Sequence, residues 1–346
     1  MAKPRRKSSK RKRSGAAGLL ATVVLIVFAG AGLGAWLVLT PYGPATETLI
    51  KVAPGSSTAR IGRELEAAGL VRSRFAFDVL RLVKKGTLKA GMYRFDHPAS
   101  VPEVYERIER GDVYTVSVTI PEGANIFDIG TRLQEAGIGT RRRFVMAAME
   151  EVGLVRDLDP EAKSLEGYLF PDTYRFSPDA TDEQIAAAMV RRFRRAAAEL
   201  GLKQNVHQVV TIASLVERET AVGSERPLVA SVFDNRLAKD MPLMSDPSVI
   251  YGLELAGRWT GTIHQSDLSF NTAYNTYLHA GLPPGPVANP GIPSLRAAMD
   301  PARTDYLYFV AAGANPQGIS LFASTLDQHH RDVTGYRRAV KRAGER

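Results

Sequence analysis

The sequence predicts an α+β fold: one apolar N-terminal helix, then a small repeated α+β module, then a larger α+β domain. Three observations predict it. Residues 18–39 form an uninterrupted apolar stretch. Two segments, which start at Ala53 and Pro121, match each other at a constant offset of 68 residues. From Ser164 onward the composition shifts toward aromatic residues, glycine and proline. A chain of 346 residues is long enough for two such folded parts.

Charge and cysteine content exclude several classes of protein. The net charge is +9, but eight Lys and Arg side chains lie within the first thirteen residues, and removing them leaves +1. The basic character therefore belongs to a tail and not to a surface that binds nucleic acid. The chain has no cysteine. This excludes disulfides, thiolate metal sites, iron–sulfur clusters and a cysteine nucleophile.

The apolar stretch predicts a transmembrane helix over residues 15–40. Its 22-residue core, 18–39, would be about 33 Å long as a helix, close to the thickness of a bilayer's hydrocarbon core. The positive residues before it predict a cytoplasmic tail (1–14), a single pass through the cell membrane, and an extracytoplasmic remainder. The alternative is a cleaved signal peptide. The stretch is longer than a typical signal core, and the PYGP sequence at 41–44 is a poor cleavage site.

After a linker (41–48), residues 49–150 are predicted to form the repeat module. Each copy shows a strand (49–52 and 116–120), a glycine turn, a helix and a glycine that ends the helix. Phe75 and Phe144 follow in a second helix. Short strand–helix–helix–strand modules of this kind occur in carbohydrate-binding LysM domains, so a LysM-like module is one interpretation and a rigid spacer the other. The matched pairs are Gly55/Gly123, Ile61/Ile129, Gly62/Gly130, Leu65/Leu133, Ala68/Ala136 and Gly69/Gly137.

The remaining residues, 151–346, are predicted to form a separate catalytic domain. Periodicity indicates helices over 182–200, 205–220, 226–238 and 326–341, and a hairpin of strands over 306–310 and 319–323. Between 239 and 301 the chain is rich in Gly, Pro and Asn and is predicted as long loops. Such loops are costly to order unless they bind something.

The motifs of several enzyme classes are missing. The extracytoplasmic part has no GxSxG, HExxH or GxxxxGK[ST] sequence. His329 and His330 are adjacent on a predicted helix surface, where neighbouring side chains project about 100° apart and do not converge on one metal ion. We therefore expect neither a metal site nor a cofactor.

Acid chemistry is the remaining possibility, and it centres on two glutamates. The helix over 205–220 ends in Glu217 and Glu219. A carboxyl group held against apolar side chains has a raised pKa and can serve as a general acid. Glu219 follows Val216, Leu215 and Ile212 on the apolar face, whereas Glu217 lies on the flank, so geometry slightly favours Glu219. Alternatively both simply end the helix, although acids there oppose its dipole.

At this point an ordered series of motifs resembles a known family. The motifs are LEGYLFPDTY (165–174), ASLVERET (213–220), VASVFDNRL (229–237), DPSVIYG (246–252), TAYNTY (272–277), GLPPGP (281–286) and NPG (289–291). Together with the N-terminal anchor they resemble the endolytic murein transglycosylases, also called the YceG-like or MltG family, over roughly residues 45–340. Ser248 and Pro286 stand where the family commonly has Thr and Ala.

The resemblance implies a lyase that cleaves the β-1,4 bond from N-acetylmuramic acid to N-acetylglucosamine within peptidoglycan strands. Glu219 matches the family's catalytic glutamate, which acts first as acid and then as base, leaving a 1,6-anhydromuramoyl end. The implied partners are glycan strands, the lipid bilayer and peptidoglycan synthases, with a role in terminating nascent strands. No cofactor, metal or nucleic acid is implied.

Further polar and aromatic residues are candidates for orienting the sugars, and for each a structural role is equally open. They are Asn235, Asp246, Tyr274, Asn275 and Tyr277, with Glu217, Glu166 and Asp172 as weaker candidates. Two other functions stay open at this point. One is a muramidase that uses Glu219 with Glu217 or Asp246 as a second carboxylate. The other is a catalytically silent scaffold that binds peptidoglycan.

Overall fold

The computed structural model describes residues 13–315 and 318–344, and the chain divides into two compact units between Thr115 and Val116. The predicted cytoplasmic tail lies outside the described residues, apart from its last two. Unit 1 contains α1 (Arg13–Leu39), β1 (Thr48–Val52), α2 (Thr58–Ala67), α3 (Arg74–Lys84), β2 (Gly91–Phe95) and α4 (Val101–Arg110). Unit 2 contains β3 (Val116–Ile120), α5 (Ile126–Glu135), α6 (Arg141–Glu150), η1 (Val152–Leu154), β4 (Asp172–Phe176), α7 (Asp182–Leu200), α8 (Val206–Glu219), η2 (Gly223–Glu225), α9 (Arg226–Leu237), α10 (Asp246–Leu255), η3 (Gln265–Ser269), α11 (Ile292–Met299), β5 (Tyr308–Ala311), β6 (Ser320–Ala323) and α12 (Leu326–Gly344).

The predicted apolar helix is present as α1, and residues 18–39 are long and apolar enough to cross a membrane. Its last turn belongs to the fold of unit 1, where Val38 packs against the core. Arg72 fixes this end: its Nη1 donates to the carbonyl oxygen of Thr40 at 3.0 Å, and its guanidinium lies 4.3 Å from the ring centre of Trp36.

The internal repeat is confirmed and is longer than the sequence match indicated. Both copies have the order strand, helix, helix, strand, helix, and in each the two strands pair antiparallel: β1 with β2 and β3 with β4. The sequence Tyr-Arg-Phe closes both strand pairs, at 93–95 and at 174–176. These triplets are 81 residues apart and not 68, because the second copy has a longer connection between α6 and β4.

The structure moves the predicted boundary between module and catalytic domain from residue 150 to residue 115. The reason is the pairing of β3 with β4, which draws the second copy into unit 2. Ile129 of α5 and Phe144 of α6 are buried in the same core as Phe193 of α7. Phe75 and Phe144 lie in the second helix of each copy, as predicted. The buried counterpart of Phe144 is, however, Phe77, while Phe75 is exposed.

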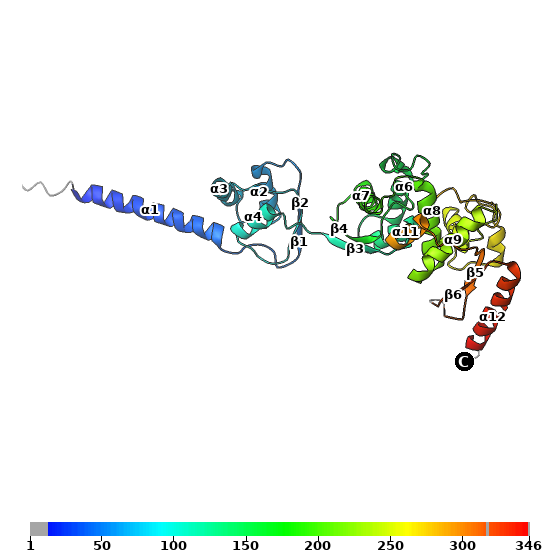
Figure 1. Cartoon of the computed structure of the whole chain (residues 1–346). Coiled ribbons are helices and arrows are strands. Elements are labelled where there is room, and N and C mark those ends of the chain that lie inside the picture. Colours follow the sequence, from blue (N-terminus) through cyan, green and yellow to red (C-terminus); the bar gives the residue numbers. More distant parts are fainter. Residues whose placement is uncertain (1–12, 316–317, 345–346) are drawn as a thin grey trace, which may run out of the picture. The chain divides into compact units, whose positions relative to one another are not determined.

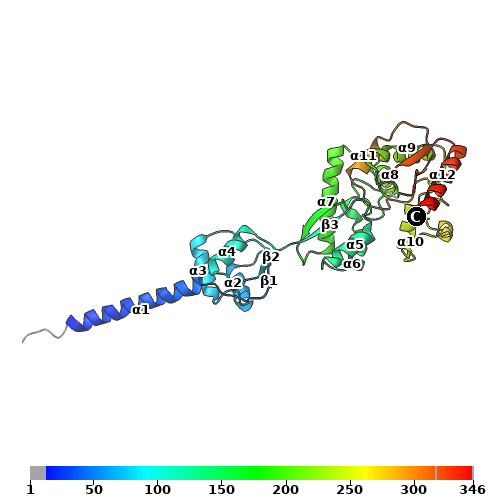
Figure 2. The same cartoon turned by 90° about the horizontal axis from the view of Figure 1, so that it is seen from below.

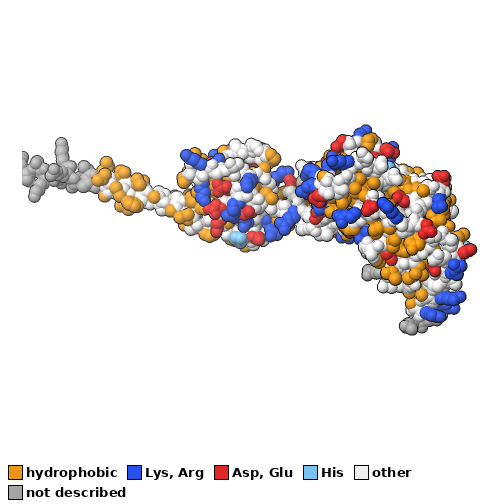
Figure 3. All heavy atoms as spheres, in the orientation of Figure 1, with side chains coloured by type: hydrophobic (Ala, Val, Ile, Leu, Met, Phe, Trp, Pro, Cys, Tyr) orange, Lys and Arg blue, Asp and Glu red, His pale blue; other side chains and the backbone are white. Residues whose placement is uncertain are grey.

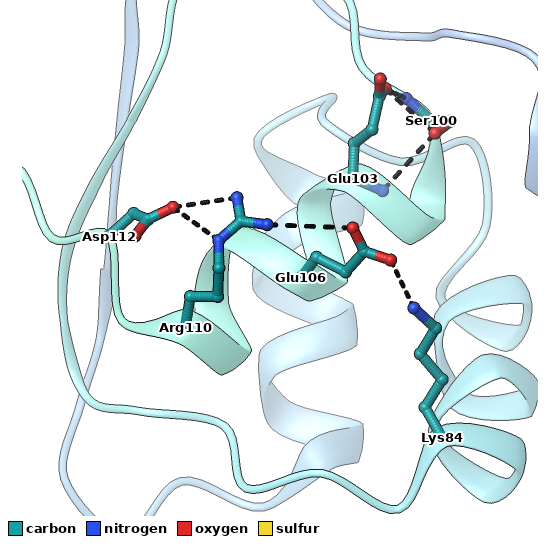
Figure 4. A network of polar contacts seen from close by, with 6 residues as sticks. All are labelled: Lys84, Ser100, Glu103, Glu106, Arg110 and Asp112. Carbon is teal, nitrogen blue, oxygen red and sulfur yellow. Dashed lines mark hydrogen bonds and ion pairs between the residues drawn. The ribbon is translucent and has the colours of Figure 1, made fainter.

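Unit 1 encloses a core of its own, formed by β1, β2 and the inner faces of α2, α3 and α4. The helix α4 begins with a capping box, in which Ser100 accepts from the backbone of Glu103 and the Glu103 carboxylate accepts from the Ser100 N–H. Figure 4 shows how α4 is tied to α3, since Lys84 forms an ion pair with Glu106.

The second half of unit 2 packs α8, α9 and α11 against one another around a further apolar cluster. In Figures 1 and 2 the β5–β6 hairpin lies beside these helices, and α12 follows it to the C-terminus. The hairpin and α12 agree with the sequence prediction. Between residues 239 and 301, however, the chain forms α10 and α11 in addition to loops. Both helices have a proline in their first turn, Pro247 in α10 and Pro293 in α11. Proline is favourable there because the N–H it lacks would have no partner within the helix.

Candidate active site

Glu219 is the last residue of α8, a helix whose residues 210–216 are all buried. Ile212, Leu215 and Val216 fix the rotation of α8, because all three are in the apolar cluster shared with α9. The helix ends as Thr220 turns to an extended conformation, and its hydroxyl donates to the carboxylate of the buried Glu225 at 3.1 Å. The chain therefore stops being helical directly after Glu219, which presents that carboxyl at the rim of the core.

The carboxyl opens into a cavity of ≈ 540 Å³. A cavity of this size lies within the range of small-molecule binding sites. Its walls come from α8, α9, residues 243–246 at the start of α10, the loop that carries Tyr277, β5 and α12. The lining residues are Glu219, Phe233, Arg236, Leu243, Met244, Asp246, Tyr277, Tyr308, Phe309, Leu326, His329, His330, Val333 and Arg337.

Glu219 is poised to hold a proton near neutral pH. Burial raises its pKa to about 7, because desolvation disfavours the anion, and the nearby negative charge of Asp246 adds to the effect. Ser245 Oγ donates to Glu219 Oε1 at 2.6 Å and, with the positive charge of Arg236, opposes the shift. The balance gives a carboxyl that exchanges its proton readily in the range where a general acid works best.

Two of the predicted candidates, Asp246 and Tyr277, line the same cavity as Glu219. Tyr277 Oη donates to Asp246 Oδ1 at 2.6 Å, which orients the carboxylate at the start of α10. Asn275 lies behind them and is fully buried. Its side chain donates to the carbonyl oxygens of Leu268 and Phe270, and it accepts from the N–H of Tyr277. It holds the loop that carries Tyr277.

Glu217 and Glu166 lie away from the cavity and have structural partners. Glu217 Oε1 accepts from Arg226 Nη2 at 3.1 Å, and its Oε2 accepts from the N–H of Gly291, the residue that precedes α11, at 3.0 Å. Glu166 is fully buried. It accepts from the N–H of Ile126, at the first turn of α5, and from Asn289 Nδ2. Burial raises the pKa of Glu166 to about 8.

The other three candidates are placed apart from Glu219 as well. Asn235 donates from its side chain to the carbonyl oxygens of Thr304 and Tyr306 and so holds the segment that enters β5. Tyr274 packs edge-on against Tyr251, with ring centres 4.9 Å apart. Asp172, at the start of β4, pairs with Arg192 Nε at 2.8 Å.

Sequence reasoning missed several groups around Glu219. Ser245 directly precedes the DPSVIYG motif and Arg236 lies within the VASVFDNRL motif. Nothing in the sequence showed that their side chains point toward Glu219. Arg236 is buried and donates to the carbonyl oxygens of Leu307 and Leu243, both at 2.7 Å.

The two histidines, His329 and His330, lie on the surface of α12, as predicted, and His330 is exposed. What the sequence did not show is that α12 packs on the hairpin, so that both histidines also line the cavity. His329 stacks on Tyr308, with ring centres 5.1 Å apart, and burial lowers its pKa. Packing of α12 on β5 and β6 involves contacts distant in sequence, so helical periodicity could not reveal which side faces Glu219.

Comparisons with known proteins agree with the motif series. The model of the YceG-like family matches residues 50–335. An endolytic murein transglycosylase from Bacillus subtilis (strain 168) is 32% identical over 335 residues, which cover 90% of this chain and 91% of that protein. A protein of the same name from Streptococcus pneumoniae serotype 2 (strain D39) is 30% identical, and the match covers 82% of this chain and 57% of that protein.

A solved structure supports the same assignment. The crystal structure of a YceG-like protein from Listeria monocytogenes superposes with a TM-score of 0.54 at 30% identity, covering 82% of this chain and 98% of that one. The family model spans most of the chain, and the cavity around Glu219 lies almost wholly within the matched residues. The chain belongs to the YceG-like family.

Proposed function

We propose that this protein is a membrane-anchored endolytic lytic transglycosylase that cleaves the β-1,4 bond from N-acetylmuramic acid to N-acetylglucosamine in peptidoglycan strands. One observation carries the proposal: a glutamate whose burial raises its pKa to about 7 lies at the end of a buried helix and faces a cavity lined by both charged and apolar side chains. The names of the relatives support the same substrate class.

In the proposed reaction Glu219 acts twice. Its carboxyl first gives a proton to the glycosidic oxygen, and the bond from that oxygen to C1 of the muramoyl residue breaks. The carboxylate then takes the proton from the muramoyl 6-hydroxyl, whose oxygen bonds to C1 and closes a 1,6-anhydro ring. Glu219 ends protonated, and no water is consumed. A second carboxylate is unnecessary because the substrate carries its own nucleophile.

The surroundings of Glu219 suit this double role. Ser245 and the Arg236 charge favour the carboxylate, while burial and Asp246 favour the acid. The two forms are therefore close in free energy near neutral pH. Asp246, oriented by Tyr277, adds a negative charge to the cavity, where it would stabilise the positive character that develops at C1.

The decisive experiment compares Glu219→Gln with Glu217→Gln on purified glycan strands, with anhydro ends counted by mass spectrometry. The amide that Glu219→Gln introduces cannot deliver a proton, so we expect a loss of about 10²–10⁴-fold or more. Glu217→Gln is the matched control, two residues away on the same helix but outside the cavity. Folded Glu217→Gln protein should remain active. Full activity of folded Glu219→Gln protein would refute the proposal.

A muramidase is the second candidate, because Asp246 shares the cavity with Glu219. In that reaction Asp246 would act as the second carboxylate, and water would enter the bond. The products distinguish the two reactions: reducing ends indicate hydrolysis and 1,6-anhydro ends indicate transglycosylation. Asp246→Asn should abolish a hydrolase but leave measurable transglycosylase activity.

The setting of the enzyme is part of the proposal. We infer that α1 is an uncleaved anchor with a cytoplasmic N-terminus, which puts both units on the side where peptidoglycan lies. The strand–helix–helix–strand order of unit 1 supports a LysM-like glycan-binding role. Trimming of nascent strands beside peptidoglycan synthases, and hence termination of strand growth, would follow from the tether. An N-terminus found after residue 40 in the mature protein would contradict the anchor.

A further inference from the structure

The helix α3 of unit 1 carries an apolar stripe that no described part of the chain covers. Phe75, Val79, Leu82 and Val83 are 64%, 58%, 75% and 75% exposed. Their spacing of i, i+4, i+7 and i+8 places them along one face of the helix. The opposite face is apolar too, since Ala76 and Phe77 are buried in the core of unit 1. A helix that is apolar on both faces requires a second apolar environment.

The second copy of the repeat provides an internal comparison. Phe144 of α6 occupies the buried position of Phe77, and both side chains are fully buried. At the positions of the stripe, however, α6 has Arg142, Met146, Met149 and Glu150. Two of these four, Arg142 and Glu150, are charged and exposed, so the same fold tolerates charge at both ends of this face. The module can therefore be built without apolar side chains at the positions of Phe75 and Val83.

The stripe begins next to the end of α1. Arg72, two residues before α3, donates to Thr40 and Pro41 and lies over the rings of Trp36 and Tyr42. Tryptophan and tyrosine favour the interface between lipid and water. In both views α3 lies at the end of unit 1 from which α1 projects (Figures 1 and 2).

The charge around the stripe points to an anionic surface. Residues 72–89 contain six Lys and Arg side chains and one acid, Asp78. Arg72, Arg81 and Lys84 are engaged within unit 1, Arg81 by the hydroxyl of Tyr105 and Lys84 by Glu106 on α4 (Figure 4). Arg74 and Lys85 lie at the two ends of α3. In Figure 3 hydrophobic side chains (orange) continue from α1 onto the adjoining end of unit 1, among Lys and Arg (blue). A basic amphipathic helix of this kind is typical of interfacial membrane binding.

We propose that α3 lies in the outer interface of the membrane that α1 spans, with Phe75, Val79, Leu82 and Val83 among the lipid chains and Arg74 and Lys85 at phosphate groups. The occupant of the stripe is thus the lipid surface. Such helices sink about 5–10 Å into the boundary between head groups and acyl chains. This inference rests on the proposed anchor, and it assigns unit 1 a membrane-facing side.

Because the chain has no cysteine, single spin labels can be attached without a background. The full chain would be reconstituted into vesicles of phosphatidylglycerol and phosphatidylethanolamine, with a label at Leu82→Cys, at Met146→Cys on α6 or at Leu25→Cys in α1. Collision with oxygen, which concentrates in lipid, is compared with collision with a water-soluble nickel chelate. We expect oxygen to dominate at residues 82 and 25 and the chelate to dominate at residue 146.

The outcomes separate the two proposals. Chelate access at residue 82 with oxygen access at residue 25 would overturn the docking of α3 and leave the anchor intact. Chelate access at both would overturn both. Dipolar broadening at residue 82 that disappears on dilution with unlabelled protein would mean that a second copy covers the stripe, which also overturns the proposal.

A variant tests whether the apolar face is the cause. In Val79→Glu/Leu82→Glu protein, a label at Val83→Cys should become accessible to the chelate, while the label at Leu25 stays in lipid. Both positions are exposed, so a circular dichroism melt should match that of the parent. An unchanged lipid signal at residue 83 would contradict the inference.

Discussion

At the scale of single residues, Glu217 and Glu219 show how two neighbouring acids come to different environments. Side chains two residues apart on an α-helix point in directions that differ by about 200°. Packing of Leu215 and Val216 then sends Glu219 into the cavity and Glu217 toward Gly291. Helical periodicity predicted the face of Glu219. It could not predict the partners of Glu217, because Arg226 and Gly291 approach from other elements.

The raised pKa of Glu219 leads to a pH prediction. The proposed reaction starts from the protonated carboxyl, so activity should fall as pH rises through the pKa of about 7. We expect kcat/KM for anhydro-product formation to be highest on the acid side of neutrality and to drop about tenfold per pH unit well above pH 7. A profile that is flat from pH 6 to pH 9 would contradict this assignment.

Ser245 should set the pH at which this fall in kcat/KM occurs. Its hydroxyl donates to the Glu219 carboxylate, which lowers the pKa of that group. The Ser245→Ala variant lacks this donor, so the pKa of Glu219 should rise. The fall in kcat/KM should then move toward higher pH by about 1–2 units, since hydrogen bonds to charged groups contribute about 1.5–3 kcal/mol. The same pH profile measures the shift. The control is Ser231→Ala, since the hydroxyl of Ser231 donates to the carbonyl oxygen of Leu228. This variant should leave the pH at which kcat/KM falls unchanged.

At the scale of elements, Asn289 joins the start of α5 to the long connection before β4. It donates from Nδ2 to the Ala124 carbonyl oxygen and to Glu166, and its Oδ1 accepts from the N–H of Leu169. The side chain is fully buried. The NPG motif at 289–291 therefore serves, at its first residue, to hold elements together.

We expect Asn289→Ala to lower the free energy of unfolding by about 1–3 kcal/mol or more, because it leaves several buried polar groups without partners. Urea denaturation followed by circular dichroism measures the loss. Asn271→Ala, at an exposed position, should cost much less. Equal losses in the two variants would show that the buried network contributes nothing particular.

Helices whose apolar residues recur at a regular spacing could be predicted from the sequence. Elements without a clear pattern of their own, such as β2 and β4, could not. The helix α7 was predicted with its observed bounds, since its apolar residues recur regularly over 19 positions. The strands β2 and β4 were missed because their sequences, GMYRF and DTYRF, lack the Val and Ile residues that marked β1 and β3 as strands. The helices α10 and α11 were missed because glycine and proline surround them. The repeated Tyr-Arg-Phe triplet was the signal in the sequence that could have revealed both strands.

At the scale of the whole molecule, the division at residue 115 makes a prediction about fragments. Residues 116–346 contain a complete core and should unfold in one cooperative transition and cleave short soluble glycans. Residues 151–346 lack β3, α5 and α6, whose buried side chains are part of that core, and should fail to fold. Thermal denaturation of both fragments measures this. If the shorter fragment folds and is active, the boundary predicted from the sequence was the better one.

The contacts of Asn289 also bear on the order in which the protein acquires its structure. Unit 1 builds its core within its own stretch of chain, so it can fold as soon as that stretch is available. In unit 2 the partner that completes the turn before α5 stands 165 residues later. Closing so long a loop costs entropy before any contact is gained, which slows folding. During synthesis unit 1 can thus fold early, whereas the second copy of the same module can complete its contacts only after Asn289 has been added to the chain.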